Sequence, residues 1–326
     1  MIWLTWRLHR TQVYAGLALV ALVAAVFLPY GEAVRGSFSS HGVGACLARD
    51  TGGEPCQTTM HAFLQEFNQI ANHLATWFSP IPGLIGAIVG AGVLGREYEQ
   101  GTWRLAWTQS VPRGRWLTQR VLLVGAGITA VCLTLSQIFT WFRAPVDEVS
   151  GRFAPGAFDL EGLSLTGYTL FAFALGVLAG LLLRRTVPAI VVAFAGFMAV
   201  RMPVEFWLRE RFQTPASRLS APAFQRTLGP TSVPVVPGRP GWTLGYHLVD
   251  GSGRTLTAAE EVRVQTQAQA THDPDAYLRG LGLHLRTVYQ PAGRFWTFQL
   301  IEFSIFAGVA LVLLVLAVRL LQRRGA

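Results

Sequence analysis

The chain has 326 residues, of which 51% are hydrophobic and only 14% are charged, and its formal net charge is +9 at pH 7. A soluble domain carries about 25% charged residues, so this composition excludes an ordinary soluble globular protein. All 27 basic residues are arginine. Because lysine is absent, the chain contains no P-loop ATPase site, no Schiff-base lysine and no lysine general base.

Six apolar segments approach the roughly 20 residues that a helix needs to cross the hydrocarbon core of a bilayer. No small-residue cleavage site follows the first segment, so we expect it to be kept as a span. Only residues 184–186, which include Arg184 and Arg185, separate the fourth segment from the fifth, which predicts a tight turn. The six predicted spans are residues 13–28, 74–95, 116–142, 163–183, 187–208 and 295–318.

The arginines of the short connecting segments predict the orientation. Positively charged residues of short loops stay in the cytoplasm. With the N-terminus inside, twelve arginines and only two glutamates fall on that side, so we expect both termini there. A pI of about 10.3 would also suit nucleic-acid binding, but the excess charge borders apolar spans instead of a soluble face. The twelve are Arg7, Arg10, Arg96, Arg104, Arg113, Arg115, Arg120, Arg184, Arg185, Arg319, Arg323 and Arg324.

Three segments then lie outside the membrane, at residues 30–73, 143–162 and 209–294. The first contains Cys46 and Cys56, and an oxidising compartment favours a disulfide between them over two free thiols. Cys132 lies within the third span and is expected to be a small packing residue.

The third outer segment carries signals for folded structure. Residues 214–240 are rich in proline and predict an irregular chain, whereas residues 241–249 alternate as a strand does. Thr257 and Glu260 form a capping-box pattern that opens a short helix. Asp273 followed by Pro274 predicts a second helix, running to about Tyr289. The sequence therefore predicts an all-α integral membrane protein with six transmembrane helices, cytoplasmic termini and a small mixed α/β extracellular cap between spans five and six.

The loop at residues 96–115, between the second and third spans, is the most informative stretch. Trp103 and Trp107 are four residues apart, and Pro112 separates them from a second helix that carries arginines. This pattern predicts a short amphipathic helix at the membrane interface, with its aromatic residues buried. On its residues alone, the loop could be either a simple interfacial anchor or a contact site for a partner.

The loop resembles a family motif. Its residues Glu97-x-Glu99-x-Gly101-Thr102, followed by Thr108-Gln-Ser-Val-Pro-Arg113 and Arg115-Trp116, resemble the permease subunits of type 2 ABC transporters, in particular the bacterial exporter branch. Residues 3–10 resemble the N-terminal interfacial helix of that family, and residues 290–302 resemble the start of its last span.

The resemblance implies that residues 1–326 form one permease domain in the bacterial cytoplasmic membrane. Such a permease pairs with a second copy or a paralogue and works with two copies of a separate ATPase subunit, which binds ATP and magnesium. This chain itself would bind no cofactor. The implied ATPase-coupling residues are Glu97, Glu99, Gly101, Thr102, Arg104 and Gln109, and the implied interfacial anchors are Trp103, Trp107 and Trp116.

Ionisable side chains within apolar spans are commonly functional. Arg201 and Glu205 are four residues apart near the outer end of the fifth span, where they could pair or reach the membrane surface. Glu302, about two turns into the last span, could pair with Arg201 or Arg294, or could line a path.

Polar and aromatic residues also fall within the third span. Together with Glu302, three of them are candidates for a substrate path, although helix–helix hydrogen bonding in lipid uses the same residue types. They are Thr134, Gln137 and Trp141. The histidines have no ligand spacing, so no metal site is predicted.

The favoured function is export of a hydrophobic or amphipathic substrate, such as a drug, antibiotic, lipid or peptide, driven by a separate ATPase. One alternative is a receptor or scaffold with a sensory outer cap. The other is a polytopic membrane enzyme, which would need paired acids at the membrane face, where only Glu97 and Glu99 qualify.

Overall fold

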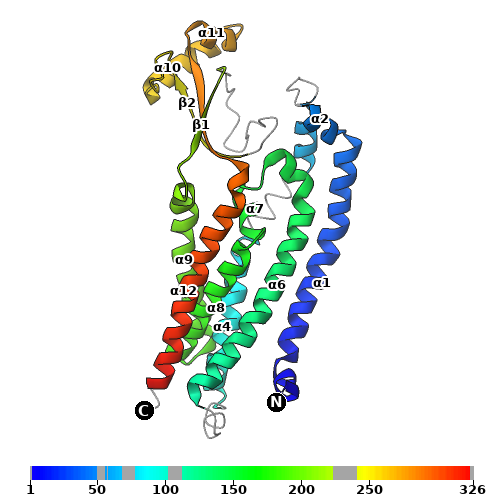
Figure 1. Cartoon of the computed structure of the whole chain (residues 1–326), viewed down its shortest axis with the longest axis vertical. Coiled ribbons are helices and arrows are strands. Elements are labelled where there is room, and N and C mark those ends of the chain that lie inside the picture. The colour runs from blue at the N-terminus through cyan, green and yellow to red at the C-terminus, as the bar shows by residue number, and fades with distance from the viewer. Residues whose placement is uncertain are drawn as a thin grey trace.

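The computed structural model describes residues 2–49, 56, 58–67, 78–101, 112–222 and 241–323, with the side chains of residues 2–12, 49 and 155 excepted. Its described part is mostly helical. The long helices are α1 (Ile2–Ser40), α4 (Ile81–Glu99), α6 (Arg113–Ser150), α8 (Ser164–Leu183), α9 (Thr186–Pro203) and α12 (Phe295–Arg323). They form one elongated bundle, and both ends of the chain lie at the same end of it, which we call the terminal end (Figure 1).

Among the described residues, five helices are long and apolar enough to cross a membrane, so the protein is a multi-pass membrane protein. They cover Val13–Ser40, Arg113–Ser150, Ser164–Leu183, Thr186–Arg211 and Ala292–Arg323. Helix α4 lies in the same bundle but is not among the five. Glycines and the charged residues at its C-terminal end lower its hydropathy. The prediction of six spans with this orientation stays a prediction, and residues 74–77 of the second predicted span lie outside the described residues.

Helices α4, α9 and α12 pack around α8, which lies at the centre of this group of four (Figure 1). It is apolar on all sides, as a helix surrounded by protein can be. Its contact with α4 depends on glycine. A Cβ atom at Gly90 would collide with the backbone carbonyl of Phe173, and one at Gly176 would lie 2.8 Å from the carbonyl oxygen of Ala87. The two backbones therefore approach closely, as small residues allow in membrane helices.

Helices α1 and α6 pack along one another and both extend beyond the predicted spans. The first predicted span ends at residue 28, yet α1 continues through Pro29 to Ser40. The third ends at residue 142, yet α6 continues through Pro145 to Ser150. The extensions are helical because they bury apolar side chains, including Val34, Val146 and Val149, in one cluster. Much of what the sequence places in outer loops is therefore helix.

Short elements complete the helical part. They are α2 (Val43–Arg49), helical residues 58–67, α7 (Pro155–Leu160), the π-helical turn η1 (Val204–Leu208), the 3-10 turn η2 (Arg209–Arg211) and the 3-10 turn η3 (Ala292–Arg294). The tight turn between α8 and α9 has Arg184 in the left-handed conformation, with φ of 55°.

An α/β unit projects from the opposite end of the bundle, which we call the α/β end (Figure 1). Strands β1 (Ala216–Ser220), β3 (His284–Gln290) and β2 (Trp242–Val249) form an antiparallel sheet in that order. Helices α10 (Ala258–Gln269) and α11 (Pro274–Gly280) complete the unit.

Local helix signals of the α/β unit are read correctly from the sequence, but two of its strands are not. Thr257 and Glu260 form the capping box of α10, and Asp273 caps α11. The predicted helix to Tyr289 is wrong, because the chain from His284 pairs between β1 and β2. Residues 216–220 form a strand, where an irregular chain is predicted; residues 223–240 lie outside the described residues. Strand pairing across more than 30 residues overrides the local pattern.

Candidate functional site

Three of the predicted coupling residues, Glu97, Glu99 and Gly101, lie where α4 ends. Helix α4 finishes at Glu99, and Gly101 then turns the chain with φ of +69°, a conformation that glycine adopts without strain. A Cβ atom there would meet nothing within 4 Å in the described structure. Within the described part of this chain, glycine is therefore favoured at this position by its backbone conformation. Thr102, Trp103, Arg104, Trp107 and Gln109 lie outside the described residues.

The two glutamates of this turn bind partners within the chain. A carboxylate oxygen of Glu97 lies 2.6 Å from the guanidinium of Arg120 on α6. Glu99 accepts hydrogen bonds from the backbone N–H of Thr186 at 2.8 Å and from its hydroxyl at 2.7 Å. Thr186 is the first residue of α9, so the Glu99 carboxylate also faces the positive end of the helix dipole. These bonds, the backbone one first, hold the pKa of Glu99 below its ordinary value.

Trp116, the third predicted anchor, is half-buried near the start of α6. It packs at the edge of the apolar cluster formed by α4, α6, α8 and α12, and the guanidinium of Arg120 lies 5.2 Å from its ring centre. The structure thus places this tryptophan against protein on at least one side.

Three of the four residues of the predicted substrate path lie on α6, at a spacing that puts them along one face of that helix, whereas Glu302 lies on α12. Thr134 and Gln137 are exposed on α6, and Thr134 bonds only to the carbonyl of Ala130 one turn earlier in its own helix. Trp141 packs against α1, where the guanidinium of Arg35 lies 3.7 Å from its ring centre. Glu302 is fully buried elsewhere.

The structure contains a disulfide between Cys46 and Cys56, whose Cα atoms are 5.5 Å apart. It joins α2 to the helical segment that follows. Cys132 is buried, and its sulfur lies 3.4 Å from the hydroxyl of Thr169 on α8, which suits a packing role. Among the described residues, no three His, Cys, Asp or Glu side chains form a metal-ligand group.

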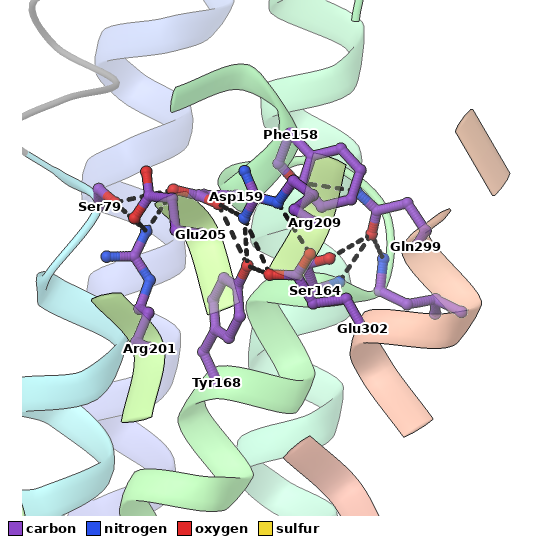
Figure 2. A network of polar contacts seen from close by, with 11 residues as sticks. Ser79, Phe158, Asp159, Ser164, Tyr168, Arg201, Glu205, Arg209, Gln299 and Glu302 are labelled. Carbon is purple, nitrogen blue, oxygen red and sulfur yellow. Dashed lines mark hydrogen bonds and ion pairs between the residues drawn. The ribbon is translucent and has the colours of Figure 1, made fainter. Parts of the chain in front are cut away.

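A buried polar network lies near the α/β end of the bundle, and Arg209 of η2 is its centre (Figure 2). The Arg209 guanidinium donates to both carboxylate oxygens of Glu302 on α12, at 2.8 and 2.9 Å. It also donates to Asp159 of α7 at 2.8 Å and to the hydroxyl of Tyr168 at 3.0 Å. The Tyr168 hydroxyl in turn donates to Glu302. Glu302 therefore pairs with Arg209, whereas the sequence suggests Arg201 or Arg294.

Arg201 of α9 forms the second half of this network (Figure 2). It pairs with Asp159, donates to the hydroxyl of Ser79 and lies 3.2 Å from Glu205, one helical turn away. The residue is only 3% exposed, so it does not extend to the membrane surface. The expected pairing of Arg201 with Glu205 is thus present, within a larger buried arrangement.

The network, which we call the Arg209 network, contains three carboxyl groups and two guanidinium groups: Asp159, Glu205 and Glu302 with Arg201 and Arg209. Buried charges are tolerated only when paired and hydrogen-bonded. Burial by itself would raise the pKa of Asp159, but the charges of Arg209 and Arg201 outweigh it and hold that pKa below its ordinary value. Asp159 is therefore ionised between the two arginines.

The side-chain amide of Gln299 on α12 holds residues 155–164, which we call the α7 segment, against α12. The side-chain oxygen of Gln299 accepts from the backbone N–H groups of Leu163 and Ser164, at 2.9 and 2.8 Å. Its amide nitrogen donates to the carbonyl of Phe158 at 2.8 Å. The segment that the sequence places in an outer loop is thus held inside the protein. The α/β unit is attached nearby, because Gln290 donates to the carbonyls of Glu210 and Gln213.

Comparison with known proteins identifies the family. Residues 17–209, more than half of the chain, match the family described as ABC-2 membrane transporter related. The chain belongs to this family. No curated protein and no solved structure matches it.

The ABC-2 family supplies the membrane subunit of a transporter, which is not itself the ATPase. The matched region of this ABC-2 protein runs from within α1 to Arg209 and so includes both glutamates of the turn after α4. It also includes every member of the Arg209 network except Glu302. The α/β unit and α12 lie beyond the match. The sequence alone did not indicate Asp159, Tyr168 or Arg209 as members of a buried network. The signal that it offered was the presence of charged residues beside apolar spans.

Proposed function

We propose that this chain is the permease subunit of an ATP-driven exporter in a bacterial cytoplasmic membrane. Membership of the ABC-2 family carries the proposal. In the proposed topology, α4 is a sixth span, the terminal end is cytoplasmic and the α/β unit is an extracellular cap. Two copies of a separate ATPase, which bind ATP and magnesium, act on a pair of permeases. The second permease is another copy or a paralogue.

Residues 96–115 are proposed to be the coupling loop. A coupling element must be rigidly connected to the helices that it moves. The loop is continuous with α4 and α6, Glu97 links α4 to α6 through Arg120, and Glu99 links α4 to α9 through Thr186. A force applied to the loop would therefore act on three helices together.

This arrangement changes the roles proposed for the loop residues. Glu97 and Glu99 are positioning residues, because their carboxylates are bound inside the permease. Contact with the ATPase falls to Thr102, Arg104 and Gln109, with Trp103 and Trp107 as the interfacial anchors. The proposed cargo is hydrophobic or amphipathic, which fits the apolar composition of the bundle.

Copurification tests the proposed function. The tagged chain, purified from membranes of its own host in mild detergent, is expected to bring an ATPase subunit with it and to show vanadate-sensitive ATP hydrolysis. Because the chain has no lysine, this activity must belong to the partner. Purified permease without any copurified ATPase would overturn the proposal. A cytoplasm-dependent reporter fused after Tyr246 is expected to be silent, and a strong signal would overturn the proposed topology.

Variants of the Glu99 link test the coupling role. Glu99→Ala removes both bonds to α9, and Thr186→Val removes only the hydroxyl bond. We expect Thr186→Val to reproduce part of the change in ATP hydrolysis that Glu99→Ala causes, and to add nothing in the double variant. The exposed neighbour change Gln100→Ala is the control. If Thr186→Val has no effect while Glu99→Ala abolishes association, then Glu99 contacts the ATPase directly.

A further inference from the structure

A second group of buried charges lies at the α/β end of α6, and nothing in the transport proposal uses it. It consists of Arg143 and Asp147 on α6, and of Arg152 and Glu161 in the chain between α6 and α8; we call it the Glu161 cluster. Arg143 and Glu161 are fully buried, with side chains 0% exposed, while Arg152 is 30% exposed. Arg152 is therefore the part of the cluster that meets the surface.

The contacts of the cluster leave one carboxylate oxygen without a hydrogen-bond donor. Arg152 donates to Oε2 of Glu161 at 2.9 Å, and Arg143 donates to Oδ1 of Asp147 at 3.2 Å. Within the part of the chain that the structure describes, no donor forms a hydrogen bond with the buried Oε1 of Glu161, although Nε of Arg143 lies 3.4 Å away; the two Nη atoms of Arg143 are also without a hydrogen bond. A bare buried carboxylate oxygen is costly, because it loses its hydration without replacement.

The missing donor is supplied if a proton lies on Glu161. Nε of Arg143 lies 3.2 Å from Oδ1 of Asp147 and 3.4 Å from Oε1 of Glu161, so the two carboxyl groups lie beside the same nitrogen atom. Two ionised carboxylates at that separation would repel one another, and such a pair retains one proton in common. A single proton on Glu161 therefore removes the repulsion and also satisfies the hydrogen-bonding capacity of Oε1.

The surroundings favour Glu161 as the group that carries the proton. Burial first, and the charge of Asp147 second, raise the pKa of Glu161 well above its ordinary value, although Arg143 and Arg152 oppose this. From α12, the ring centres of Phe295 and Trp296 lie 3.9 and 5.6 Å from the Arg152 guanidinium carbon.

We propose that Asp147 and Glu161 form a proton-binding site, in which one proton is held between two carboxyl groups and exchanges with solvent beside Arg152. Loss of the proton leaves two negative charges facing each other between α6 and the α7 segment. That segment is bound to α12 through Gln299, so protonation controls how firmly α6 is joined to α12 at this end. The site would sense pH on the side of the membrane where the α/β unit lies.

Infrared spectroscopy of the purified full-length protein tests the site directly. A protonated buried carboxyl group gives a C=O stretching band that an ionised one lacks. We expect such a band in the wild type at neutral pH, its disappearance at higher pH, and its loss at neutral pH in Glu161→Gln. Glu148→Gln, which changes the exposed carboxylate next to Asp147, is the matched control and should keep the band. Absence of any protonated-carboxyl band from the wild type at neutral pH would overturn the proposal.

Thermal stability in detergent provides a second readout. Because folding raises the pKa of Glu161, the stability that it contributes is present at low pH and is lost as pH rises above its ordinary value of 4.5 and through the folded value. The melting temperature of Glu161→Gln should therefore match the wild type at low pH and exceed it increasingly as pH rises. Asp147→Asn, which also removes the repulsion, should flatten the pH dependence if Glu161→Gln does not fold. Wild-type and variant curves that stay parallel from pH 4 to pH 9 would refute the site.

Discussion

Replacement of Arg209 by methionine tests whether the Arg209 network stabilises the bundle. Arg209 makes four hydrogen bonds, of 2.8 to 3.0 Å, to Glu302, Asp159 and Tyr168. Among the described residues, it is the only basic side chain within ion-pair distance of Glu302. Arg209→Met therefore leaves one buried carboxylate without a cation. Loss of one partner from a buried pair costs about 3–5 kcal/mol, and we expect this loss in the free energy of unfolding.

The assay is equilibrium unfolding in detergent micelles at neutral pH. Arg211→Met is the control, because Arg211 is exposed and bonds only to the carbonyl of Trp207; we expect a change within about 0.5 kcal/mol. The double variant Arg209→Met with Glu302→Gln removes a cation and a carboxylate together. It should recover at least about half of the loss, since broken pairs couple strongly. The reasoning is refuted if Arg209→Met is no more destabilising than Arg211→Met, or if the double variant recovers nothing.

Two further changes test the packing and the covalent link. Gly90→Ala places a methyl group against the carbonyl of Phe173 and should destabilise the protein by about 1–3 kcal/mol. Gly127→Ala is the control, because the space around Gly127 is open, and it should be neutral or stabilising. The melting temperatures of the two variants test this difference. Reduction of the disulfide between Cys46 and Cys56 should lower stability by about 2–4 kcal/mol, measured as a lower melting temperature in reductant, and an unchanged melting temperature would contradict this.

The parts of the fold that depend on local signals can be read from the sequence. The fourth predicted span, residues 163–183, differs by one residue from α8, because Arg184 and Arg185 stop the apolar run abruptly. The capping box of α10 and the cap of α11 follow from side chains within three residues of the bonds they make. In each case the residues that decide the structure are neighbours in the chain.

The sequence fails where charge balance depends on distant segments. Residues 143–162 are read as an outer loop because they contain arginines and acids, which in isolation prefer water. Arg143 is nevertheless fully buried, since Asp147 and Glu161 lie beside it. Arg209 likewise looks like the first residue of an outer segment, and its partners lie 50 and 93 residues away. No local pattern contains this information.

The sequence by itself determined that the protein is a multi-pass membrane protein, because length and hydropathy are local properties. Through the family resemblance, it also indicated Glu97 and Glu99 as candidate coupling residues. Only the tertiary structure decided what those carboxylates bind, since Arg120 and Thr186 come from other helices. The two buried charge clusters exist for the same reason: burying an ion is favourable only after folding has brought its counter-ion to it.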